Sequence, residues 1–93
     1  MEIQSAILLY AINEIDLPDG ADILSASEHK GKVHIWFRCD PDQPAKKRTF
    51  VVCGLRSPAP TPQTSQYIGS MNLSGSMLHV FEKIQPGTDN AGR

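Results

Sequence analysis

The sequence predicts a small all-β domain, built as an antiparallel β-sandwich or a partly open barrel of about six strands. Short runs rich in β-branched and aromatic residues recur along the chain, and turns that contain Gly or Pro separate them. No stretch shows a long helical period, although one short N-terminal helix fits the pattern. The 93 residues suffice for one domain with a modest core. We expect residues 1–83 to form this domain and residues 84–93 to form a flexible tail.

The first apolar run, residues 6–12, has two interpretations. Its seven residues fit either a strand or a short helix, because periodicity over so few residues does not separate the two. Pro18-Asp19-Gly20 follows and predicts a tight turn, since proline fixes φ and glycine accepts a positive φ. The sequence therefore predicts a short strand or a short helix before the turn at Pro18-Asp19-Gly20.

Residues 23–28 and 33–39 predict a β-hairpin with Lys30-Gly31 at its tip. The second run, VHIWFRC, is rich in residues that favour strands. A slip by one residue would move every apolar side chain to the opposite face, so the hydrophobic pattern selects one register. The predicted pairs are Ala26–Ile35 and Leu24–Phe37 on an apolar face, and Ser27–His34, Ser25–Trp36 and Ile23–Arg38 on the other face.

The last third of the chain combines a proline-rich loop with a second hairpin. Residues 55–65 contain three prolines and no periodicity, which indicates a functional loop or an ordered cover over the core. Residues 67–73 and 77–82 predict two strands joined at Ser74-Gly75, a connection of usual hairpin length.

The concentrated positive charge lies at the start of a predicted strand, residues 49–53. One interpretation is a solvated edge strand, where cations discourage aggregation. The other is an anion site for a phosphate group or an acidic partner surface. The candidate residues are Lys46, Lys47 and Arg48, with Arg38 on the neighbouring strand and Arg56 on the proline-rich loop.

Two aromatic residues are candidates for binding a partner. Trp36 falls, by the predicted register, on the face away from Ile35 and Phe37. Either a second layer of the fold covers it or it anchors a partner. Tyr67 begins the closing hairpin, beside the proline-rich loop. An exposed patch around Trp36, Tyr67 and this loop would indicate a protein partner.

No catalytic or metal-binding motif stands out. His79 faces Ser70 in the predicted closing hairpin, as a nucleophile and base would, but no third orienting group accompanies the pair. A polar pair on a solvated face explains it better. We therefore expect no catalytic residue, no metal site and no cofactor.

Charge and cysteine usage exclude some function classes. The net charge of −1 argues against binding of duplex nucleic acid, which binds most strongly to a basic face.

Cys39 and Cys53 indicate buried free thiols of a reducing compartment. A hairpin between residues 33–39 and 47–53 would place them at opposite ends, too far apart for a disulfide. The N-terminus resembles neither a signal peptide nor a membrane span, so we expect a cytoplasmic protein without a membrane partner.

The segment LPDGADILS at residues 17–25 and five shorter motifs between Trp36 and Phe81 together resemble a family of small, uncharacterised phage and prophage proteins. That family favours Gly-His where this chain has Arg56-Ser57, and Gly-Gly where it has Gly75-Ser76. The matching segments are residues 17–25 (LPDGADILS), Trp36 followed by Asp40-Pro41, Arg48-Thr49-Phe50, Gly54 with Pro58 and Pro60, Tyr67-Ile68-Gly69, and His79-Val80-Phe81.

The resemblance implies an accessory protein that acts in the cytoplasm of an infected bacterium. We therefore expect a non-catalytic protein that neutralises a component of antiviral defence. It would act as an anti-CRISPR-type inhibitor of a host protein, or as a sponge that sequesters a nucleotide messenger in an arginine-lined pocket. The alternative is a structural or assembly component of the virion. We also expect a homo-oligomer, because so small a core gains by burying a sheet edge or face.

Overall fold

The computed structural model describes residues 1–84, which form seven strands and one 3₁₀ turn. The expected all-β class is confirmed, and this part of the chain contains no α-helix. The predicted tail, residues 84–93, lies outside the described residues except for Ile84. The elements are β1 (Glu2–Leu8), β2 (Ile12–Pro18), β3 (Asp22–His29), β4 (Lys32–Cys39), β5 (Ala45–Cys53), η1 (Pro62–Thr64), β6 (Ser65–Leu73) and β7 (Ser76–Lys83).

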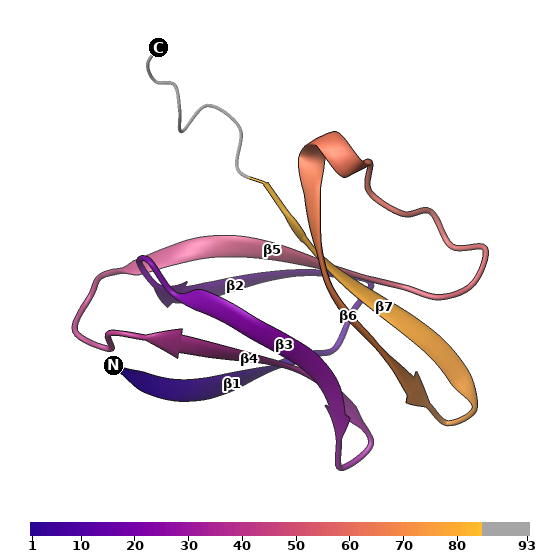
Figure 1. Cartoon of the computed structure of the whole chain (residues 1–93), viewed down its shortest axis with the longest axis horizontal. Coiled ribbons are helices and arrows are strands. Elements are labelled where there is room, and N and C mark those ends of the chain that lie inside the picture. Colours follow the sequence, from indigo (N-terminus) through magenta and orange to yellow (C-terminus); the bar gives the residue numbers. More distant parts are fainter. Residues whose placement is uncertain (85–93) are drawn as a thin grey trace.

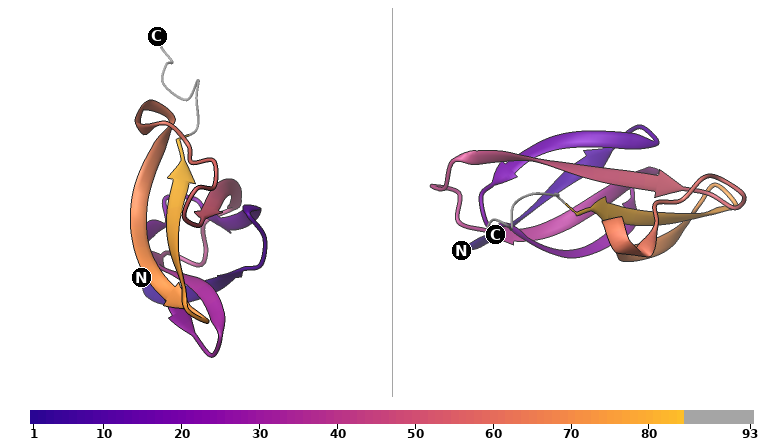
Figure 2. Two further views of the ribbon diagram at one scale, coloured as in Figure 1. Left: turned by 90° about the vertical axis from the view of Figure 1, so that its right-hand side faces the viewer. Right: turned by 90° about the horizontal axis from the view of Figure 1, so that it is seen from above.

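The strands form two antiparallel sheets, as in a sandwich. The first sheet has three strands in the order β1-β4-β3, and the second has four in the order β2-β5-β7-β6 (Figure 1). The sheets do not close into a barrel, so the sandwich is the correct one of the two predicted architectures. The view from above in Figure 2 shows β6 and β7, in orange and yellow, at one end of the molecule and the N-terminus at the other.

The core lies between the sheets and follows the alternation of the strands. In β4, Val33, Ile35, Phe37 and Cys39 are at most 4% exposed, whereas Arg38 points outward. Alternate side chains of a strand point to opposite faces, so this pattern buries one face of β4 completely. The remaining members of the core come from both sheets, and include Leu8, Leu17, Ala21, Ala26, Phe50, Met71 and Val80.

Both predicted hairpin turns are confirmed. Lys30 and Gly31 have φ of 53° and 79°, and Ser74 and Gly75 have φ of 51° and 84°. Positive φ at both central residues is the type I′ conformation that matches the twist of a hairpin. One side chain supports each turn: the Glu28 carboxylate accepts a hydrogen bond from Gly31 N, as the Asn72 amide oxygen does from Gly75 N.

A β-bulge changes one end of the predicted β3–β4 register. The pairs Ala26–Ile35, Ser27–His34 and Ser25–Trp36 form as predicted. Leu24 is an extra residue in β3, so Phe37 faces Ile23 instead of Leu24, and Arg38 faces Asp22 instead of Ile23. Because the bulge removes Leu24 from the alternation, its side chain is 44% exposed.

Of the two interpretations of residues 6–12, the helix was wrong and the strand was correct only in part. This run contains the end of β1, a tight turn and the first residue of β2. The cause is Asn13, whose buried side chain accepts hydrogen bonds from Leu9 N and Tyr10 N and donates one to Tyr10 O. Those bonds satisfy the backbone of the turn, so the chain reverses inside an apolar run that carries no Gly or Pro.

The predicted pairing of residues 33–39 with 47–53 was also wrong. These segments are β4 and β5, and they belong to different sheets. β4 pairs with β1 and β3, whereas β5 pairs with β2 and β7. The thiols of Cys39 and Cys53 are nevertheless free, as expected.

Candidate functional site

The inner face of β5 changes from apolar to charged along the strand. Phe50 is fully buried, the Arg48 side chain is 18% exposed, and Lys46 lies at the exposed start of the strand. Residues two apart share a face, so β5 presents a phenyl ring, a guanidinium and an ammonium group in sequence, from the core outward.

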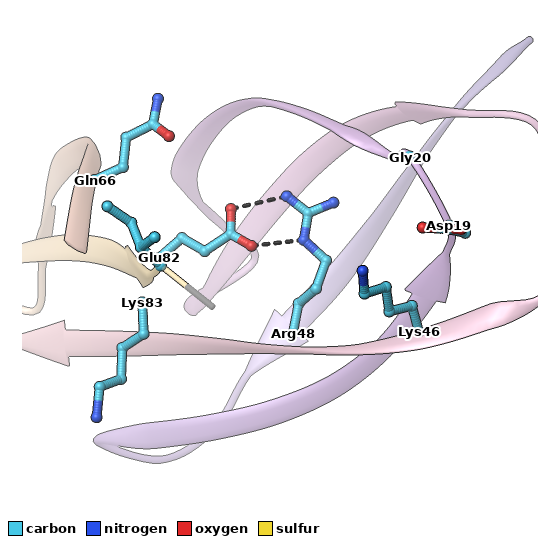
Figure 3. Close-up of a pocket in the computed structure, with 8 residues that line it drawn as sticks. Asp19, Gly20, Lys46, Arg48, Gln66, Glu82 and Lys83 are labelled. Carbon is cyan, nitrogen blue, oxygen red and sulfur yellow. Dashed lines mark hydrogen bonds and ion pairs between the residues drawn. The ribbon is translucent and has the colours of Figure 1, made fainter. Parts of the chain in front are cut away.

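Arg48 is held at both ends of its guanidinium. Its Nε and Nη2 donate to the two carboxylate oxygens of Glu82 on β7, at 2.5 Å and 2.8 Å, and Figure 3 shows this two-point contact. Its Nη1 donates to the carbonyl oxygen of Ala21, which follows the Pro18–Gly20 turn. The Glu82 side chain is only 15% exposed. Arg48 therefore ties this turn to β7 and already uses much of its hydrogen-bonding capacity.

A pocket of about 330 Å³ lies beside this ion pair. Figure 3 shows the Lys46 ammonium group on the side of the pocket that faces Asp19, whereas the Lys83 side chain points away from the ion pair. A second hollow, of about 280 Å³, shares Arg48, Gln66 and Glu82 with the first. The pocket is lined by Asp19, Gly20, Lys46, Arg48, Gln66, Glu82, Lys83 and Ile84.

The structure brings together only two of the five predicted basic residues, Lys46 and Arg48. Arg38 was expected beside them but lies in the other sheet, where it forms a 2.6 Å ion pair with Asp22. Lys47 is on the opposite face of β5 from Arg48, 3.9 Å from Glu14. Arg56 is exposed in the proline-rich loop.

Four apolar side chains form a row across the outer face of the four-stranded sheet. Ile12 on β2 faces Val51 on β5, Val51 faces Phe81 on β7, and Phe81 faces Tyr67 on β6. The rings of Tyr67 and Phe81 meet edge to face at 5.2 Å. Ile12 and Tyr67 are 62% and 51% exposed. We call these four residues the apolar row; only Tyr67 was a candidate from sequence, because the row depends on the order of the strands.

Tyr67 and His79 contact each other at one end of the apolar row. The Tyr67 hydroxyl and His79 Nδ1 share a 3.0 Å hydrogen bond. His79 faces Ser70 in the register, as predicted, but the partner of its ring nitrogen is Tyr67. The contact leaves a polar group at the end of an otherwise apolar surface.

Trp36 is half-buried on the outer face of the three-stranded sheet. Its indole Nε1 donates to Ser27 Oγ at 2.9 Å, and its ring stacks on His34 with centroids 5.8 Å apart. Neither predicted alternative describes it well, since neighbours on its own sheet cover it rather than a second layer. Trp36 and Tyr67 lie on different sheets, so they do not form one patch.

The two cysteine thiols are buried. Burial raises the pKa of the Cys39 thiol, to which the carboxylates of Glu2 and Asp40 add, and burial also raises the pKa of Cys53. Among residues 1–84, no three His, Cys, Asp or Glu side chains are placed to hold a metal ion. Within the same residues, no helix has the length and apolar character needed to cross a membrane.

The fold and these surfaces define a small antiparallel β-sandwich with an ion-paired pocket and an exposed apolar row. The chain belongs to the family described as a domain of unknown function, DUF7352, whose model matches residues 5–91. The matched region includes all of residues 17–81, the segment that contains the motifs resembling a family of uncharacterised proteins. No curated protein and no solved structure matches the chain.

Proposed function

We propose that the chain is a non-catalytic binding protein that docks on a partner protein through the apolar row. The observation that carries this proposal is the continuity of the row across all four strands, with Ile12 and Tyr67 more than half exposed at its two ends. Contiguous exposed apolar surface is typical of interaction sites, and tyrosine is enriched where binding energy concentrates.

The chemistry of the row indicates the kind of partner. The row itself carries no charge; Glu14 beside it lies 3.9 Å from Lys47, and the exposed Lys83 lies two residues after Phe81 on the same face of β7. An apolar protein surface fits the row, since a charged group buried directly against these four side chains would lose its hydration. The hydrogen-bonded pair of Tyr67 and His79 offers one polar contact at the end of the row.

In its biological role, we propose that the protein is a phage accessory protein that acts in the bacterial cytoplasm and neutralises a host defence protein in the manner of an anti-CRISPR inhibitor. The resemblance of its motifs to phage proteins supports this role. The small size of the chain also suits an inhibitor that works by occupying a surface, which requires an exposed patch and no catalytic group.

Plating efficiency tests the proposed function. The chain would be expressed in bacterial strains that each carry one defence system, including CRISPR–Cas, and in the same strain without any. We expect it to raise phage plating in one defended strain only. Ile12→Lys should abolish that effect, whereas Leu24→Lys, a similar change at an exposed residue of the other sheet, should preserve it. Unchanged plating in every strain, or equal activity of both variants, contradicts the proposal.

A second candidate function, sequestration of a nucleotide messenger, rests on the 330 Å³ pocket. Its volume and the Lys46 ammonium group suit a small anionic ligand. Arg48 weighs against it, because Glu82 already engages that guanidinium. Calorimetry with a cyclic dinucleotide tests this candidate: binding that Lys46→Ala removes would support it, and the absence of binding contradicts it.

A further inference from the structure

The first strand has an edge with which no other segment of residues 1–84 pairs. β1 lies at the end of the three-stranded sheet and has β4 as its single neighbour (Figure 1). It contains seven residues, EIQSAIL, with no proline, no interruption of the register and one charged side chain, that of Glu2 at its first position. The free N–H and C=O groups of such an edge are a template for another strand.

The other three sheet edges are protected. β2 carries Glu14 and Asp16 and ends in Pro18. β3 and β6 each contain a β-bulge, and they pack against each other where the two sheets meet. Charges, prolines, bulges and coverage are the usual means by which proteins prevent strands from adding to an edge. Within the described part of the chain, β1 has none of them beyond the charge of Glu2 at its first position.

The outward side chains of β1 are complementary to themselves. Ile3 and Ile7 lie on the outer face and are 66% and 43% exposed. Ile3 lies two residues before Ser5 and Ile7 two residues after it. If two β1 strands pair antiparallel with Ser5 facing Ser5, Ile3 of each copy faces Ile7 of the other. Met1 and Leu9, 83% and 63% exposed, face each other in the same register. Cross-strand apolar pairs of this kind stabilise a sheet.

We propose that two copies of this chain pair through β1, about a two-fold axis at Ser5, into one six-stranded sheet with β1 strands at its centre. The contact is isologous, so it closes with two copies and exposes no further edge of the same kind. The apolar row lies on the other sheet and stays free in the dimer. One strand pair buries less surface than a standard interface, so we expect a dimer that depends on concentration.

Paired charge substitutions test this register. Sedimentation velocity of the full chain should show a reversible monomer–dimer equilibrium. The double variant Ile3→Lys/Ile7→Lys should weaken the dimer by about tenfold or more, because lysines then face lysines in both pairs. The double variant Ile3→Glu/Ile7→Lys should restore it, because each glutamate then faces a lysine. Ile12→Lys, on β2, should have no effect.

A crosslink tests the position of the two-fold axis. Ser5 is exposed, so Ser5→Cys should form a disulfide-linked dimer under mild oxidation, since facing residues of antiparallel strands are within about 6 Å between Cα atoms. Ser70→Cys, on the protected strand β6, is the matched control and should form no disulfide-linked dimer under the same oxidation. Cys39 and Cys53 are buried and give little background.

Circular dichroism would first establish that each variant is folded. A wild-type chain that remains monomeric, a dimer that survives the double lysine variant, or equal crosslinking from Ser5→Cys and Ser70→Cys would each overturn the proposal. If β1 instead receives a strand from a different protein, the wild type alone stays monomeric, and the dimer is rejected. A failed dimer would leave the plating test of the apolar row unaffected.

Discussion

Arg48 and Glu82 form a two-point ion pair between β5 and β7, although 34 positions separate them in the chain. Glu82 faces Phe50 in the register, and Arg48 lies two residues before Phe50 on the same face, so the pair runs diagonally across the sheet. Both side chains are more than four-fifths buried. The pair therefore closes one end of the core, and the Arg48 bond to Ala21 attaches the turn between β2 and β3 to it.

We expect the two single variants of this pair to destabilise the protein. Glu82→Ala leaves a mostly buried guanidinium without a counterion, and Arg48→Ala leaves an equally unpaired carboxylate. Each should lower the free energy of unfolding by about 2–4 kcal/mol, measured by urea titration. The double variant Arg48→Met/Glu82→Leu should recover at least half of that loss, because no charge is then left unpaired.

The exposed pair of Arg38 and Asp22 provides the matched control. Both of its side chains are more than half exposed, so Arg38→Ala should change the unfolding free energy by less than about 1 kcal/mol. A loss for Arg48→Ala no larger than that for Arg38→Ala would show that the buried pair has no special role in stability.

Gly69 permits the close approach of the two sheets, and we predict a sharp dependence on side-chain size there. A Cβ at Gly69 would lie 3.4 Å from the carbonyl oxygen of Ala26 on β3 and 3.7 Å from its nitrogen. A methyl group fits at ordinary contact distance, so Gly69→Ala should change stability by no more than about 1 kcal/mol. Gly69→Leu should cost about 1–3 kcal/mol, because the larger side chain must push β3 from β6.

Thermal unfolding of both Gly69 variants measures this effect. Gly75→Leu is not a suitable control, because Gly75 has a positive φ and any side chain there is strained. Gly54→Leu is more suitable, since a Cβ there would meet only side-chain atoms, at 3.7 Å. Equal losses for Gly69→Leu and Gly54→Leu would contradict the importance of the contact with Ala26.

The features predicted correctly from the sequence depend on neighbours along the chain. The turns at Lys30-Gly31 and Ser74-Gly75, and the hairpins around them, follow from local φ preferences and alternation. The order of the strands depends on which distant segments pair, so the contact of β5 with β7, the Arg48–Glu82 pair and the apolar row were all missed. One signal was present: Arg48 and Glu82 each lie two residues from a buried residue, Phe50 and Val80, and so share the core face.

The turn between β1 and β2 was missed for a different reason, and it gives a third prediction. Asn13 is 5% exposed, and its side chain forms hydrogen bonds with three backbone groups of this turn, namely Leu9 N, Tyr10 N and Tyr10 O. Asn13→Ala leaves these groups without partners and should cost about 2–3 kcal/mol in urea titration. Asn72→Ala removes one exposed bond, to Gly75 N, and should cost less than about 1 kcal/mol.

Asn13→Asp separates the two roles of this side chain. The carboxylate retains the acceptor for Leu9 N and Tyr10 N but loses the donor to Tyr10 O and Phe50 O. We expect a loss smaller than that of Asn13→Ala near neutral pH. A loss for Asn13→Ala as small as that for Asn72→Ala would show that the turn forms without its side-chain bonds.

The two buried thiols give the last prediction, which concerns pH. Burial raises the pKa of Cys39 and Cys53 above their usual value of 9.0. Because the folded protein holds these protons more tightly, the unfolded chain releases them first as the pH rises. The stabilisation from this source is complete below the unfolded pKa and is lost as the pH passes between the unfolded and the folded values. The free energy of unfolding should therefore fall above about pH 9.

The double variant Cys39→Ala/Cys53→Ala isolates this effect from the ionisation of other groups. Urea titrations from neutral to alkaline pH should show a smaller fall in unfolding free energy for the variant than for the wild type. The same burial predicts that iodoacetamide labels both thiols slowly in the folded protein and rapidly in urea, because the thiolate is the reactive form. Equal pH dependence in the two proteins, together with rapid labelling of the folded chain, would mean that these thiols are accessible and titrate as they do in a peptide.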